Sequence, residues 1–219
     1  AVVLLYSPQT VFRVMGTLGE ERLRPDVTFV PMPLMHYPNL PARMLSEAPE
    51  LRQLFAGLEL TGDLREPDLQ SLAAERPLFI ELDARVPLSL YETLAPEGLY
   101  VRVLAGGATD TDIQEGRAGQ QALWTELLAE AGPNLDPETR AQVLYRRFHD
   151  AMFLAAVGDR EGARAAIDVV LRLAPSEALA LALSAALAVP DETGPVDRAL
   201  IEALFGQLDR DPSAPAPTR

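Results

Sequence analysis

The feature that most restricts the fold is the position of the strand-like runs, all of which fall in the first 104 of 219 residues. Ala1–Tyr6 is a continuous apolar run, as expected for a strand buried on both faces of a sheet. Shorter apolar runs at Val27–Pro31, Leu78–Leu82 and Leu99–Leu104 predict three more strands. After residue 107 the alanine- and leucine-rich patterns predict helices only. The chain is therefore expected to begin as α/β and to continue as all-α.

The first two strands flank a helical pattern, which together form a βαβ unit. Thr10 is expected to cap this helix by accepting a backbone N–H. Crossovers of this kind are right-handed, so the two strands should be parallel with the helix on one face. We expect a small, mostly parallel four-stranded sheet in a three-layer, Rossmann-like domain. Its boundaries are residues 1–131, including a linking helix at Thr111–Ala131.

Residues 132–208 are expected to form stacked helical hairpins, and the proline- and alanine-rich residues 209–219 a disordered tail. Leu144–Pro175 fits a single tetratricopeptide-like unit, with small residues where two antiparallel helices touch and a proline after the second helix. The matching positions are Ala151, Leu154, Gly158, Asp159, Ala163 and Ile167. A plain αα-hairpin would use the same turn and alanines for packing alone, and both interpretations stay open.

Two further features concern the ends of helices and the contact between the halves. Asp136 should cap a helix that has Pro137 at its first position. Trp124, the sole tryptophan, is expected to be buried and to pack the α/β half against the helical half.

Composition excludes several classes of function. A net charge of −13 has the wrong sign for attracting a phosphate backbone, so no nucleic acid partner is expected. The chain has no cysteine or lysine, which excludes disulfides, thiol nucleophiles, Schiff bases and a P-loop lysine. With two histidines, neither a metal nor a cofactor is expected. The longest apolar run, Ala178–Val189, is twelve residues, well short of the roughly 20 that a membrane span needs.

Candidate ligand-binding residues lie where the first strand ends and the first helix begins. Ser7, Gln9 and Thr10 occupy this position, at which open α/β sheets commonly bind ligands. This segment contains no glycine, so its backbone cannot approach a pyrophosphate closely. Helix capping is the alternative role for Thr10. Glu81 and Asp83, near the end of the third strand, could form a paired-carboxylate site or be ordinary solvated charges.

Candidate partner-binding residues lie on the repeat-like helices. Tyr145, Phe148 and Met152 would line a groove if the repeat builds one, and core packing is the alternative for all three. Asp110 and Asp112 follow a glycine pair, in a pattern that suits either a cation-binding loop or a loop that enters a capped helix.

Several segments resemble a known family. AVVLLYSPQTVFRVMGTLGEERLRPDVTFVPMPLMHYP, RPLFIEL at Arg76–Leu82 and LAPEGLYVRVL at Leu94–Leu104 are similar to the soluble C-terminal region of bacterial membrane proteins of the protein O-mannosyltransferase-like group. Arg24-Pro25-Asp26-Val27 opens the second strand as in that group. Where its first strand usually leads into Gly-Asp, this chain has Ser7-Pro8.

The resemblance implies a non-catalytic accessory domain on the extracytoplasmic, periplasmic side of a bacterial membrane. The catalytic carboxylates of that group lie in loops of the membrane core, and the resemblance places none in this chain. The partner would be the protein's own upstream membrane domain or another protein, and a chain that begins without methionine is expected to be a segment of something longer. Two alternatives stay open, with a cytoplasmic location: a free-standing tetratricopeptide-like scaffold, and a small-molecule-binding or hydrolytic α/β module acting at Ser7–Thr10.

Overall fold

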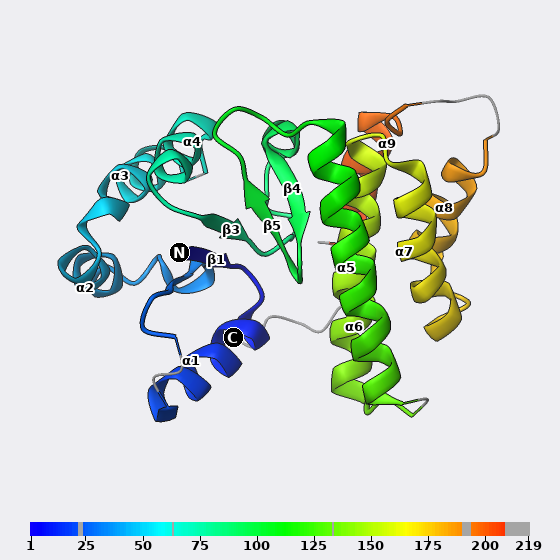
Figure 1. The fold of residues 1–219 in the computed structure, drawn as a ribbon, viewed down its shortest axis with the longest axis horizontal. Helices are drawn as coiled ribbons and strands as arrows, with labels where there is room; N and C mark the ends of the chain where they lie inside the picture. Colours follow the sequence, from blue (N-terminus) through cyan, green and yellow to red (C-terminus); the bar gives the residue numbers. More distant parts are fainter. Residues whose placement is uncertain (22–23, 63, 133, 190–193, 209–219) are drawn as a thin grey trace. The chain divides into compact units, whose positions relative to one another are not determined.

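The computed structural model describes residues 1–21, 24–62, 64–132, 134–189 and 194–208. The expected tail at 209–219 lies outside these residues. The chain divides into two compact units, Ala1–Asp112 and Ile113–Arg219 (Figure 1). The linking helix thus falls mainly in the second unit, whereas the sequence predicts a boundary at residue 131 that would place it in the first. In the described residues, no helix combines the length and apolarity needed to cross a bilayer.

The first unit contains a mixed five-stranded sheet of order β2-β1-β3-β5-β4. The strands are β1 (Val2–Leu5), β2 (Thr28–Pro31), β3 (Leu78–Ile80), β4 (Leu94–Glu97) and β5 (Tyr100–Val103). β1 is parallel to β2 and β3, whereas β5 is antiparallel to β3 and β4. An α/β start followed by helices, with the first two strands parallel, is therefore confirmed. The expected mostly parallel four-stranded sheet is wrong, because β4 and β5 form an antiparallel hairpin.

β4 is the strand that the sequence does not predict, because Pro96 signals a turn there and yet lies inside this strand. A proline cannot donate to a strand ladder, so it is tolerated mainly on edge strands, and β4 is an edge of the sheet. Pro31 likewise lies on the other edge strand, β2. Glu97 pairs with Tyr100, which leaves a two-residue turn whose first residue, Gly98, has φ 63°.

Helices lie on both faces of this sheet (Figure 1). The strand order runs from β1 outward to β2 and then back across to β3, so right-handed crossovers place α1 on one face and the helices after β2 on the other. These elements are α1 (Pro8–Glu21), α2 (Asn39–Glu47), α3 (Arg52–Thr61) and α4 (Glu66–Glu75), with short 3-10 turns at Met32–Leu34, Pro49–Leu51 and Leu88–Thr93.

α1 differs from its sequence prediction in two ways. The helix begins at Pro8, and the backbone N–H of Thr10 donates to the Ser7 hydroxyl at 3.4 Å, so Ser7 rather than Thr10 is the cap. Phe12 and Met15, which share the apolar spacing of the buried Val11, are 68% and 46% exposed. The apolar stripe of α1 is therefore wider than the face that it buries.

The second unit is helical throughout its described residues. Its helices are α5 (Asp110–Ala131), α6 (Pro137–Ala156), α7 (Arg160–Leu173), α8 (Ala178–Leu187) and α9 (Arg198–Leu208). α6 and α7 form an antiparallel hairpin in which Ala151 and Ala163 are fully buried. Gly158 turns the chain with φ 90°, and Asp159 caps α7 by accepting from the Gly162 N–H at 3.0 Å. The hairpin suits both sequence interpretations, so the tetratricopeptide-like assignment stays a prediction.

The Asp136 cap is confirmed. Its carboxylate accepts the backbone N–H groups of Glu138 and Thr139, each at 3.0 Å. Pro137 stands at the first helical position, where its missing N–H costs nothing.

A matched pair of glycines tests the packing of α3. A Cβ on Gly57 would overlap the carboxylate of Asp68, which is 2% exposed and accepts from Arg65 Nε at 2.6 Å. We expect Gly57→Ala to lower the free energy of unfolding by about 1–2 kcal/mol in urea denaturation. The control is Gly119→Ala in α5, where a Cβ meets nothing within 4 Å. Gly119→Ala should raise the free energy of unfolding by up to about 1 kcal/mol. If both variants raised it, or both lowered it, the close packing of Gly57 against Asp68 would be contradicted.

A second prediction concerns acid titration before β2. Arg24 donates to both carboxylate oxygens of Asp26, at 2.9 and 2.8 Å, and this lowers the pKa of Asp26 to about 2. Because the pKa is depressed in the folded state, any stabilisation by this pair is complete above the ordinary pKa and is lost as the pH falls toward 2. In NMR titration, Arg24→Ala should return the Asp26 pKa to near 4. An unchanged midpoint would contradict the pairing.

Candidate functional site

The strand order reverses at β1, which has β2 on one side and β3 on the other. The carboxyl ends of the parallel strands β1 and β3 therefore meet at the position where open α/β sheets bind ligands. Tyr6 and Ser7 follow β1 here, and Glu81 follows β3. The fold thus brings the predicted residues Ser7, Gln9 and Thr10 beside Glu81, from more than 70 positions along the chain.

The Glu81 carboxylate occupies the amino end of α1. Glu81 is fully buried, and its Oε2 accepts the backbone N–H groups of Tyr6 at 2.7 Å and Ser7 at 2.9 Å. Its Oε1 accepts the hydroxyl of Thr10 at 2.7 Å. A helix N-terminus favours negative charge, and in many α/β proteins a phosphate binds there. In this chain the protein supplies its own anion at that position.

The other predicted ligand residues are also engaged within the fold. Ser7 is 5% exposed, and its hydroxyl donates to Gln9 Oε1 at 3.0 Å. Thr10, half-buried, donates to Glu81 instead of capping the helix as expected. These contacts place all three residues in a hydrogen-bonded cluster around the Glu81 carboxylate, and ligand binding by them stays a prediction.

Asp83 is paired with an arginine, Arg85. Arg85 donates from Nε and Nη2 to Asp83 at 2.6 and 2.9 Å, and from Nη2 to the Tyr6 carbonyl at 2.8 Å. Its guanidinium lies 5.3 Å from the centre of the Tyr6 ring. Burial, and then the charge of Asp83, raise the pKa of Tyr91 well above its ordinary value. Glu81 and Asp83 thus have different hydrogen-bond partners, and a paired-carboxylate site formed by the two stays a prediction.

The predicted groove residues of α6 lie in the interior of the helical unit. Phe148 and Met152 are 5% and 0% exposed, and Tyr145 is half-buried. His149, on the same side of the helix, has its ring 4.2 Å from Tyr145 and 5.9 Å from Phe205 of α9. These contacts favour core packing for this face, which α9 covers; partner binding by these residues stays a prediction.

On the opposite side of α6, a buried polar cluster contacts α5. Asp150 Oδ2 accepts from Trp124 Nε1 at 3.1 Å and from Arg147 Nη1 at 2.9 Å, and its Oδ1 accepts from Gln120 Nε2 at 3.4 Å. All four side chains are at most 7% exposed. Burial raises the pKa of Asp150, against the opposing effect of Arg147, and burial lowers the pKa of Arg147.

Trp124 is therefore buried, as the sequence predicts. Its hydrogen bond is to α6, and the Arg147 guanidinium lies 5.2 Å from the centre of its ring, within the range of a cation–π contact. Both partners belong to the second unit, so these contacts give it a structural role there. Packing of the two halves through Trp124 stays a prediction.

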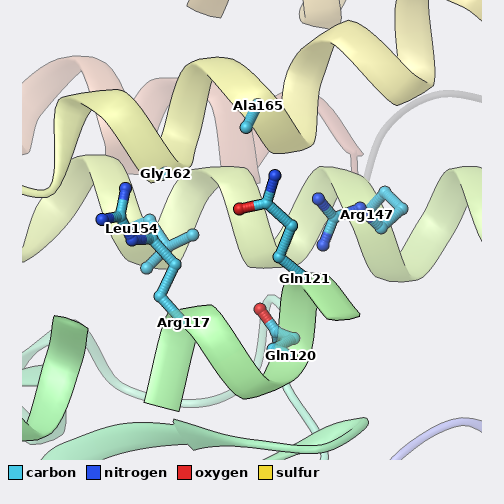
Figure 2. Close-up of a pocket in the computed structure, with 7 residues that line it drawn as sticks. All are labelled: Arg117, Gln120, Gln121, Arg147, Leu154, Gly162 and Ala165. Atoms are coloured by element: carbon cyan, nitrogen blue, oxygen red, sulfur yellow. The ribbon is translucent and has the colours of Figure 1, made fainter. Parts of the chain in front are cut away.

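A small hollow lies beside this cluster (Figure 2). Its volume is about 10 Å³, room for about one water molecule. It is lined by Arg117, Gln120, Gln121, Arg147, Leu154, Gly162 and Ala165. Arg117 is paired with Asp159 at 3.2 Å and with Glu161 at 3.4 Å. Arg147 Nε is buried with no hydrogen-bond partner among the residues that the structure describes.

The loop before α5 caps the start of that helix. Asp112 Oδ2 accepts the Thr109 N–H at 2.8 Å, and the Thr109 hydroxyl accepts the Asp112 N–H at 3.2 Å, which is a reciprocal cap. Over the described ranges, no three histidine, aspartate or glutamate side chains gather in a way that could hold a metal ion.

Arg85, Gln120 and the Asp150 cluster are not predicted from the sequence. The Asp150 cluster has one signal in the sequence, the opposite charges of Arg147 and Asp150, which are three residues apart on one side of a helix.

Comparison with known proteins gives no match to a family model, to a curated protein or to a solved structure. The family resemblance therefore rests on the quoted sequence segments alone.

Proposed function

We propose that this chain is a non-catalytic accessory region of a longer, glycosyltransferase-like membrane protein, and that it acts by contact with that protein's membrane domain or with another protein. The observation that carries the non-catalytic part is the position of Glu81. This carboxylate accepts two backbone N–H groups at the end of β1, where α/β enzymes commonly place a phosphate or another anionic group of their substrate. The sequence segments similar to the O-mannosyltransferase-like group support the membrane connection.

Cell fractionation tests the membrane connection. An antibody raised against the purified chain should detect a species larger than 23.8 kDa in the membrane fraction of the source cells. Protease added outside spheroplasts should remove this species if the region faces the periplasm, and lysed spheroplasts serve as the control for antibody access. A 23.8 kDa species in the soluble fraction would contradict the proposal and favour the free-standing tetratricopeptide-like scaffold.

The small-molecule-binding α/β module is the weaker alternative, because the Glu81 carboxylate places a negative charge at the amino end of α1, where a phosphate would bind. Calorimetric titration with inorganic phosphate, and with a nucleoside diphosphate sugar, distinguishes this module from the proposed accessory region. We expect no saturable heat from the wild-type chain. Saturable binding that Gln9→Ala weakens would favour the module acting at Ser7–Thr10.

A further inference from the structure

The contact of α5 with the α6–α7 hairpin resembles the binding of a separate helix in a groove. α5 makes polar contacts with the hairpin through Arg117, Gln120 and Trp124, which stand at positions i, i+3 and i+7. This spacing places them on one stripe of the helix, which is the usual pattern of anchors in a groove-bound helix. Figure 2 shows Arg117 and Gln121 extending from α5 toward the hairpin, with Gln120 lying beside the α5 backbone.

The two sides of this contact are chemically complementary. In these three contacts α5 supplies the donors: a guanidinium, an amide N–H and an indole N–H. The hairpin supplies carboxylates, with Asp150 accepting from Gln120 and Trp124, and Asp159 and Glu161 paired with Arg117. We name the part of the hairpin that lies here the α5-receiving face, defined as Arg147, Asp150, Leu154, Asp159, Glu161, Gly162 and Ala165.

α5 satisfies this face incompletely. The buried Nε of Arg147 has no acceptor among the described residues, and the hollow lies beside it. Gln121 lines the same hollow from α5 (Figure 2). Gly119 lowers the helix propensity of α5 by about 1 kcal/mol relative to alanine, although a Cβ there would meet nothing within 4 Å. The resident helix is therefore weaker than the fold would allow.

From these observations we propose that the α5-receiving face is a helix-binding site, and that α5 is its resident, displaceable ligand. The partner is a helix that presents a cation, an amide and an indole at i, i+3 and i+7. A carboxylate one residue after the amide, in the place of Gln121, would supply the acceptor that Arg147 Nε lacks. This inference rests on the partner-binding role proposed above and names the chemistry of the partner.

A competition experiment with the full chain tests this site. The probe is a fluorescein-labelled peptide of residues 110–131, followed by anisotropy as the chain is added. We expect it to bind the chain carrying Arg117→Ala and Gln120→Ala at least about tenfold more tightly than the wild-type chain, because the weakened resident helix competes less. A peptide carrying the same two substitutions should lose binding to both chains. A Gln121→Glu peptide should bind about tenfold more tightly than the native peptide, since it gives Arg147 a charged acceptor.

Equal affinity of the native peptide for the two chains would overturn the proposal, and so would equal binding by the substituted peptide. Circular dichroism verifies that the double variant is folded. If it is not, Gln120→Ala alone serves, because it removes one hydrogen bond and leaves Trp124 on Asp150. The assay uses purified chain, so its failure leaves the cell-fractionation result unaffected, and the two proposals can fail separately.

Discussion

Replacing Glu81 by alanine is expected to lower the free energy of unfolding by about 3 kcal/mol or more. The change leaves the N–H groups of Tyr6 and Ser7 without their buried acceptor, and each unsatisfied buried donor costs about 1–3 kcal/mol. It also removes a negative charge from the amino end of α1. Urea denaturation followed by circular dichroism measures the loss.

Glu81→Gln is the matched control. Its carbonyl oxygen can replace Oε2 as the acceptor for both backbone N–H groups, and its amide can donate to the Thr10 hydroxyl. The expected cost is therefore about 1 kcal/mol, chiefly for the lost charge. Thr10→Val, which removes only the hydroxyl that donates to Oε1, should also cost about 1 kcal/mol. If alanine and glutamine at position 81 were equally destabilising, charge rather than hydrogen bonding would hold this end of the sheet.

Asp150→Ala is expected to be as damaging, with a cost of about 3–5 kcal/mol. The substitution leaves the guanidinium of Arg147 buried without its partner carboxylate, which is the expensive way to break a buried ion pair. The indole N–H of Trp124 loses its acceptor in the same step. Urea denaturation again measures the cost, and fluorescence of Trp124 reports the local change directly.

A double-mutant cycle separates the ion pair from general packing. Arg147→Ala with Asp150→Ala should cost less than the sum of the two single variants, by about 2 kcal/mol, because no charge is then left buried alone. Glu202→Ala in α9 is the surface control. Its partner Arg198 lies at 3.0 Å, and both side chains are more than half exposed, so a loss of at most about 0.5 kcal/mol is expected. Additive costs at positions 147 and 150 would show that the two residues are not coupled.

How far the sequence predicts the structure depends on the range of each physical signal. A local signal suffices at Asp136, whose side chain reaches only two and three residues ahead. Tyr6 and Ser7 meet Glu81 from across 75 and 74 positions, and this contact depends on which strand lies next to β1. Strand order is a property of the whole sheet. The position of Ser7 at the carboxyl end of β1 was therefore predictable from the sequence, whereas its contact with the buried Glu81 was not.

The helical unit shows the same limit. The spacing of Tyr145, Phe148 and Met152 correctly marks one apolar stripe of α6, but a stripe that faces α9 and one that faces a partner look alike in sequence. The polar stripe on the other side is visible as Arg147 and Asp150. The partners of this stripe, Gln120 and Trp124, lie on α5 and could not be predicted, because only the fold brings α5 next to α6.

The prolines on the two outermost strands have a consequence for assembly. An edge strand with a continuous row of free N–H and C=O groups can recruit another strand, from a partner or from a second copy. β2 ends in Pro31 and β4 carries Pro96, so on each side the row of donors lacks one member. Strand addition is therefore disfavoured at both edges of the sheet, and a protein that recognises the α/β unit is expected to contact its helices and loops.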